Sequence, residues 1–188
     1  FSILGLFTIF YLGAIQPNLV KKRAEDHYIV INNTIDHLQR LNISFNSKDI
    51  KTFLLSTRFL FQSLDRVQFY DMKGDLVGDT NILDLDQNVF IRSDIIIEET
   101  IDGQIKEKVN SEKFIKEQNK NLIKETILNR YQDEPITISE NIQKNFFVST
   151  LSRIKLNKKD AGYIVVSEEA NDILNAVKER KAFIIRTV

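Results

Sequence analysis

The chain has 188 residues, enough for one domain with short attachments, and it is 43% hydrophobic and 28% charged, as folded proteins are. Its 26 basic and 26 acidic side chains cancel, which argues against nucleic acid or another polyanion as a partner. The sequence has no cysteine, which excludes disulfides, thiolate nucleophiles and cysteine-based metal sites.

The N-terminal stretch is apolar and uncharged. Residues 1–15 contain no Asp, Glu, Lys or Arg, and Gln16 and Pro17 follow them. A bilayer span needs about 20 apolar residues, and proline is well placed in a first helical turn. We therefore interpret residues 1–17 as the end of a first transmembrane helix that leaves the membrane at Pro17. A buried core helix is the alternative. Apolar sequence at both ends indicates a fragment of a longer protein.

Residues 18–41 are predicted to form one long helix. Its apolar positions are separated by four, three, four and three residues, which is the spacing of a coiled-coil seam. The seam consists of Ala24, Tyr28, Ile31, Ile35 and Leu38. Such a stripe on a helix that leaves a membrane favours pairing with the same helix of a second copy. Packing against the chain's own sheet is the alternative.

Both histidines lie on this predicted helix. His27 and His37 are ten residues apart, which separates them by about 80° around the helix axis. They therefore cannot bind one metal ion together. We expect them to be solvated or to take part in helix pairing, and a pH-sensing role is the alternative.

A second amphipathic helix and a β-hairpin follow. Apolar residues at helical spacing predict the helix, and these are Ile50, Phe53, Leu54, Phe61 and Leu64. Val67 and Phe69 then alternate with polar neighbours, which is typical of a strand with one buried face. Residues 71–74 predict a turn, because an aspartate that bonds back to the backbone opens it and a glycine that accepts positive φ closes it. A short strand restarts at Leu76.

The middle of the chain has a less regular pattern. Residues 81–93 are predicted to form an acidic loop, and a small hairpin is expected around Asp102 and Gly103. Residues 111–131 are predicted to be helical, most strongly from Leu122, and Pro135 ends this region. We interpret the whole segment as a variable insertion.

The C-terminal part predicts two strands and a helix. Residues 145–156 form the first strand, with one apolar face made of Phe146, Val148, Ile154 and Leu156. A polar turn over residues 157–162 leads to the return strand, residues 163–166. From residue 168 the apolar spacing is helical again, so the last strand feeds directly into a helix that aims at a second membrane crossing.

Carboxylates cluster around the predicted hairpin and just after it. They are Asp71, Asp75, Asp79, Asp84 and Asp86. Clustered carboxylates bind divalent cations or raise one another's pKa into an acid-sensing range, which makes these five the candidate signal-sensing residues. Turn formation is the alternative explanation for Asp71 and Asp75. No catalytic, cofactor-binding or metal-binding motif is present in the sequence, so we expect neither catalysis nor a cofactor in this segment.

Residues 66–80, RVQFYDMKGDLVGDT, resemble a stretch of the extracytoplasmic sensor domains of bacterial membrane histidine kinases, most of all the ChvG/ExoS type of alphaproteobacteria. A second resemblance lies near the C-terminus, where a strand runs from Gly162 through Ser167 into a charged helix. No motif of this family lies between residues 82 and 140. The residues that carry the fold signature are Arg66, Tyr70, Asp71, Gly74, Asp79 and Gly162.

The resemblance implies a mixed α/β (α+β) fold, that is, a PAS-like or PDC-like sensor domain with a central antiparallel sheet and a long N-terminal helix. This domain would occupy residues 18–167, and residues 168–188 would lead into a second transmembrane helix. The implied function is sensing of an envelope or pH stimulus in the periplasm, at the bacterial inner membrane, and its transmission through the C-terminal helix to a cytoplasmic histidine kinase. The alternatives are a membrane-tethered protein-interaction module, or the sensor domain of a chemoreceptor or a cyclase.

The resemblance also implies partners. These are a second copy of the chain in a homodimer, the membrane, and a response regulator that the absent cytoplasmic part would serve. Some relatives are held inactive by a periplasmic regulatory protein. ATP and magnesium would belong to the absent kinase domain, whose reaction is phosphotransfer from ATP to a histidine.

Overall fold

A computed structural model describes residues 2–81, 122–142 and 145–187 of the chain. It has a five-stranded antiparallel sheet flanked by helices, which confirms the predicted mixed α+β class with a central antiparallel sheet. The long N-terminal helix is confirmed as well, because α1 (Ser2–Arg40) runs for 39 residues. The predicted acidic loop and the predicted hairpin around Asp102 lie outside the described residues.

The sheet joins strands from both ends of the chain. Its strands are β1 (Arg66–Tyr70), β2 (Leu76–Asp79), β3 (Ile136–Ile142), β4 (Asn145–Leu156) and β5 (Lys159–Glu169). Their order is β2-β1-β5-β4-β3, and each neighbouring pair is antiparallel. The central contact is therefore between the first strand of the chain and the last, with Val67 opposite Val166 and Phe69 opposite Ile164.

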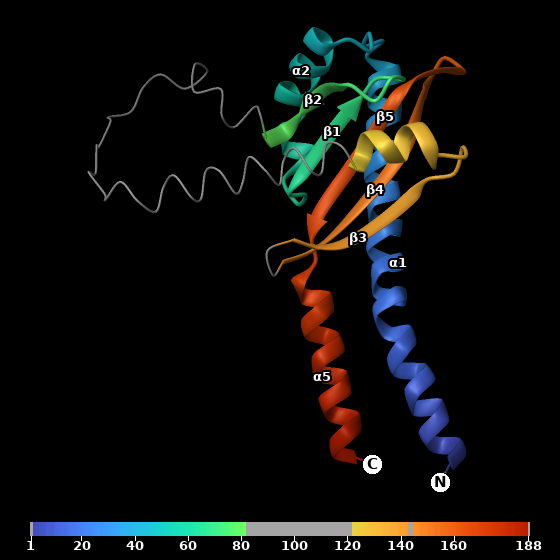
Figure 1. Cartoon of the computed structure of the whole chain (residues 1–188). Helices are drawn as coiled ribbons and strands as arrows, with labels where there is room; N and C mark the ends of the chain where they lie inside the picture. Colours follow the sequence, from blue (N-terminus) through green and yellow to red (C-terminus); the bar gives the residue numbers. More distant parts are fainter. Residues whose placement is uncertain (1, 82–121, 143–144, 188) are drawn as a thin grey trace, which may run out of the picture.

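Helices cover both faces of this sheet (Figure 1). On one face lie α1 and α2 (Ser47–Ser56), and the helix of residues 122–129 lies on the other. The alternation of side chains along each strand divides the apolar residues between the two layers. In β1, for example, Val67 and Phe69 face α1 and α2, whereas Tyr70 faces the helix of residues 122–129.

The larger core layer lies between the sheet and the first two helices. It contains Ile31 and Leu38 of α1 and Phe53 of α2, each at most 1% exposed. Strand residues complete it, namely Val67, Phe69, Ile154, Ile164 and Val166. The predicted apolar faces of β1 and β4 are confirmed. Ile154 and Leu156 of β4 face this layer, whereas Phe146 and Val148 of the same strand face the layer between the terminal helices.

A second layer joins the two terminal helices. A single residue separates the end of β5 from the start of α5 (Asn171–Thr187). Ile173 and Val177 of α5 pack with Ile15 of α1. Figure 1 shows α1 and α5 leaving the same end of the sheet side by side, with both chain ends there. The predicted direct passage from the last strand into a helix is confirmed.

The N-terminal helix differs from the prediction in one way, because it is continuous through Pro17, which lies inside α1 and does not begin a new helix. Three seam residues, Ala24, Ile31 and Leu38, are at most 4% exposed in the single copy, and the other two, Tyr28 and Ile35, are half-buried. The alternative, packing on the chain's own sheet, is therefore confirmed for the three buried side chains. Pairing with a second copy stays a prediction.

The remaining predictions are confirmed in part. The second helix ends early, at Ser56, and its apolar pattern continues in the short 3-10 helix η1 (Arg58–Phe61). Strand β3 was not predicted. Within the part of the chain that the structure describes, no helix is both long enough and apolar enough to span a membrane.

Candidate functional site

The described members of the predicted acidic site, Asp71, Asp75 and Asp79, have separate partners. Asp71 closes its own turn, since its Oδ1 accepts the backbone N–H of Lys73 at 2.8 Å and that of Asp75 at 2.9 Å. Asp75 is exposed and accepts a hydrogen bond from Lys124 Nζ at 2.6 Å. Asp84 and Asp86 lie outside the described residues. The turn explanation for Asp71 is therefore confirmed.

The side chain of Asp79 points into the protein, and its hydrogen bonds hold two strands together. Its side chain is fully buried and accepts from Arg66, at 2.5 Å to Nη2 and 3.1 Å to Nε, and from Gln68 Nε2 at 3.3 Å. Its other oxygen accepts the N–H of Asn81 at 3.0 Å. A carboxylate so fully engaged ties β1 to the end of β2. Among the described residues, no three acidic or histidine side chains are arranged to hold a metal ion.

Two glycines of the signature are explained by sterics. Gly74 has a φ of 77°, which few residues with a side chain adopt, and it closes the β1–β2 turn. A Cβ on Gly162 would lie 2.3 Å from the backbone oxygen of Tyr70 and 2.4 Å from the ring of Phe45. Both glycines therefore serve the fold.

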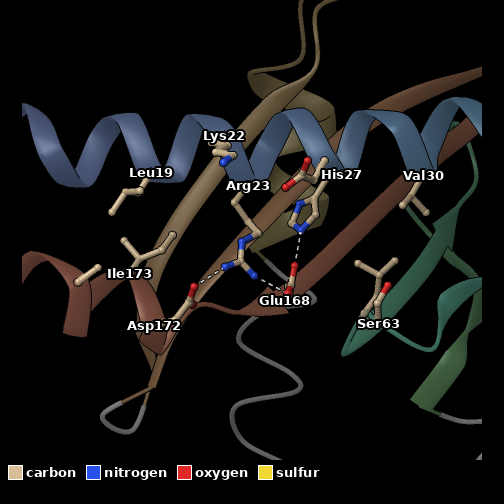
Figure 2. A pocket seen from close by; sticks show the side chains of 12 residues that line it. Leu19, Lys22, Arg23, His27, Val30, Ser63, Glu168, Asp172 and Ile173 are labelled. Atoms are coloured by element: carbon tan, nitrogen blue, oxygen red, sulfur yellow. Dashed lines mark hydrogen bonds and ion pairs between the residues drawn. The ribbon is translucent and has the colours of Figure 1, made fainter.

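A different group of charged residues lies where α1, β5 and α5 meet (Figure 2). Arg23 of α1 bonds Glu168 at the end of β5, and its Nη2 lies 2.6 Å from Oδ2 of Asp172 in the first turn of α5. Oε2 of Glu168 lies 3.4 Å from Nε2 of His27, one turn further along α1. We refer to Arg23, His27, Glu168 and Asp172 as the junction cluster.

His27 is the buried member of the junction cluster. It is 1% exposed, and its Nδ1 lies 3.0 Å from the hydroxyl of Thr150 in β4. Because a carboxylate only accepts, Nε2 carries the proton when the ring is neutral, and Nδ1 then accepts from Thr150. The expectation of a solvated or helix-pairing His27 is wrong. The helix turns this residue toward the sheet, together with Ala24 and Ile31.

Burial dominates the electrostatics of this histidine. It lowers the pKa of His27 below 6.5, while the carboxylate of Glu168 acts in the opposite direction. Arg23 adds to the lowering, and Asp26 opposes it. The ring is therefore held neutral over a wider pH range than a solvated histidine would be.

A cavity of about 450 Å³ adjoins the junction cluster. Its charged side chains are Lys22, Arg23, Asp26, Glu168 and Asp172, and apolar walls come from α1 and α5. Figure 2 shows Arg23, Glu168 and Asp172 converging from α1, from the end of β5 and from the start of α5. The cavity thus lies beside the one place where the sheet continues into the C-terminal helix.

The junction cluster links the position of α5 to that of α1. The guanidinium of Arg23 bridges the last strand and the last helix, so any movement of α5 relative to α1 must stretch or break these bonds. Ion pairs of this kind have discrete bonded and separated arrangements. Arg23 and Glu168 were not predicted as site residues. The available signal was their position, since Arg23 and His27 are one turn apart on α1 and Glu168 lies at the end of the last strand.

No known protein-family model matches the chain, and no curated protein matches it. The geometry of the fold and of the junction cluster is therefore the main basis for a proposal about function.

Proposed function

We propose that the chain is the extracytoplasmic sensing domain of a bacterial membrane-bound two-component sensor histidine kinase. In this proposal the domain lies in the periplasm, anchored in the inner membrane, and passes an envelope or pH stimulus through α5 to a cytoplasmic kinase. The observation that carries it is the continuity of β5 with α5, which runs beside α1 toward one end of the molecule. A sensing domain between two membrane helices needs this arrangement.

Two further features support the proposal. The β1–β2 hairpin holds residues 66–80, the stretch that resembles such sensor domains, and the sheet with helices on both faces is compatible with a PAS-like or PDC-like domain. Residues 1–17 would be the end of a first transmembrane helix, and residues 168–188 would lead into a second. The kinase itself, with its ATP, magnesium and response regulator, would lie outside this segment.

The junction cluster supplies the mechanism. A stimulus that changes the packing between sheet and helices would alter the bonds of Arg23 to Glu168 and Asp172. α5 would then shift or rotate against α1, as a population shift between two arrangements. In a homodimer, the α5 helices would pass this displacement to the kinase domains of both copies. The contact between copies would use a surface other than Ala24, Ile31 and Leu38, which the single copy buries.

Autophosphorylation of the whole gene product tests this proposal. Membrane vesicles that contain it are incubated with radiolabelled ATP, and we expect phosphate that is lost in acid and retained in alkali, as phosphohistidine is. Arg23→Gln is expected to change the level of phosphorylation, and Lys22→Gln, at the exposed neighbouring position, is expected to leave it unaltered. Absence of phosphohistidine at every pH would favour a protein-interaction module, a chemoreceptor or a cyclase instead.

A further inference from the structure

The outer edge of β3 is an open strand edge. β3 is the last strand of the sheet, and among the described residues none pairs with its outer side. Its seven residues pair with β4 without a bulge, whereas the pairings of β1 with β2 and of β4 with β5 each contain a register shift. Residues 136–142 also include neither lysine nor proline, the residues that commonly protect an edge. Alternate backbone N–H and C=O groups of β3 therefore point outward, and no strand in the described part of the chain pairs with them.

A groove runs beside this edge. It has a volume of about 520 Å³ and lies between α1 and β3. Thr137 and Ser139 form its strand side, and Val20, Ala24 and Tyr28 form its helix side. An edge strand beside a helix groove is the arrangement by which proteins bind an extended peptide, whose backbone pairs with the strand while every second side chain enters the groove.

The opposite face of β3 carries a carboxylate, Glu140. It is half-buried, and no cation among the described residues pairs with it. Burial raises the pKa of its carboxyl group, and no charge in the described part of the chain opposes this rise. Its neighbours on that face of β3 are Ile138 and Ile142, both half-buried. A strand added at this edge would place its own side chains beside these three residues.

From these features we propose that the edge of β3 binds an extended segment of a partner polypeptide as a sixth strand of the sheet. The segment carries aliphatic side chains at alternate positions, which enter the groove beside α1, and a lysine or arginine opposite Glu140. A second copy of β3 does not fit this description, since residues 136–142 contain no basic side chain. This inference does not depend on the proposed kinase function.

Selection from a library of random decapeptides against the full chain tests the proposal. We expect enriched peptides with aliphatic residues at every second position. One of the intervening positions, always the same, should carry a lysine or arginine. A synthetic consensus peptide should lose binding when the alternate amides that face β3 are N-methylated, because its side chains are kept and its backbone donors are removed. Enrichment of peptides with helical spacing, or equal binding by the N-methylated peptide, would overturn it.

Charge reversal at Glu140 gives a second readout. In Glu140→Lys the preference at the fixed position should change from basic to acidic residues, by about fivefold, as expected for ion pairs across strands. Glu134→Lys, at an exposed position before β3, is the matched control and should keep the basic preference. Circular dichroism checks that both variants fold, and Glu140→Gln, which should only abolish the preference, replaces Glu140→Lys if that variant is unfolded. An unchanged basic preference in a folded Glu140 variant would contradict the proposal.

Discussion

Two buried ionisable side chains of this domain, Asp79 and His27, have different environments. Asp79 is fully buried with Arg66 as its partner, and it also accepts from a side-chain amide and a backbone N–H. A buried carboxylate with this many donors is costly to disturb. His27 is equally buried, and only one of its ring nitrogens faces a charged group. The first arrangement fixes a hairpin, and the second predicts a stability that depends on pH.

The environment of His27 sets the direction of this pH dependence. Since burial lowers the pKa of His27 in the folded state, the unfolded chain binds a proton at this site that the folded chain does not. The contribution of His27 to the free energy of unfolding should therefore be fully present above pH 6.5. It should fall as the pH drops toward the lowered pKa, by at most about 1.4 kcal/mol per pH unit. Urea unfolding at a series of pH values from about 7.5 to about 5 measures it.

The control for this measurement is the other histidine. His37 is half-buried on α1, and His37→Gln should keep the pH dependence, whereas His27→Gln should reduce it between pH 6.5 and the lowered pKa. If the dependence persisted in both variants, groups other than His27, such as carboxylates, would set it. If it were lost in His37→Gln as well, it would not belong to His27 alone.

At the scale of the elements, close packing of the sheet decides which glycines can be replaced. Gly162→Ala would place a methyl group 2.3 Å from the backbone oxygen of Tyr70, which cannot move without breaking the pairing of β1 with β5. We expect it to lower the free energy of unfolding by about 3 kcal/mol, as overpacked core substitutions do. Gly13→Ala meets nothing within 4 Å on α1 and should raise the free energy of unfolding by up to about 1 kcal/mol. Denaturant unfolding compares the two, and equal effects would contradict the packing described.

Local patterns in the sequence were sufficient for most elements. The hairpin of β1 and β2, the strands β4 and β5 and the long helix α1 follow from period-two and helical spacing together with an Asp–Gly turn. β3 was missed because Ile136 and Ile138 alternate with polar residues for only a short stretch directly after Pro135. Pairing with β4 makes this segment a strand, and long-range pairing is not visible in a local window.

The junction cluster was harder to predict than the fold. Its members come from residues 23–27 and 168–172, and only the packing of α1 across β4 and β5 brings them together. Among the described aspartates of the predicted acidic site, closeness in the sequence does not bring the side chains to one place. Asp79 points into the protein and Asp71 bonds to its own turn, because side chains alternate along a strand and turn aspartates bond to their own backbone. The sensing role of the acidic residues stays a prediction.

At the scale of the whole molecule, the relation between α1 and α5 would carry the signal in the proposed sensor. The two helices share an apolar layer through Ile15, Ile173 and Val177, and Arg23 of α1 bonds both the end of β5 and the start of α5. The apolar layer is non-directional and tolerates sliding, whereas the ion pairs fix one position. Removing the guanidinium should therefore loosen the helix pair without unfolding it.

Spin labels measure this loosening directly. The chain has no cysteine, so two can be introduced at the exposed positions Asn18 and Lys178 and labelled with nitroxides. Pulsed electron–electron resonance should give a narrow distribution of label distances in the parent chain and a broader or shifted one in Arg23→Gln. Lys22→Gln, at the adjacent exposed residue of α1, should match the parent. If Arg23→Gln also matched the parent, the apolar layer alone would hold α5, and the junction cluster could not be the element that a stimulus releases.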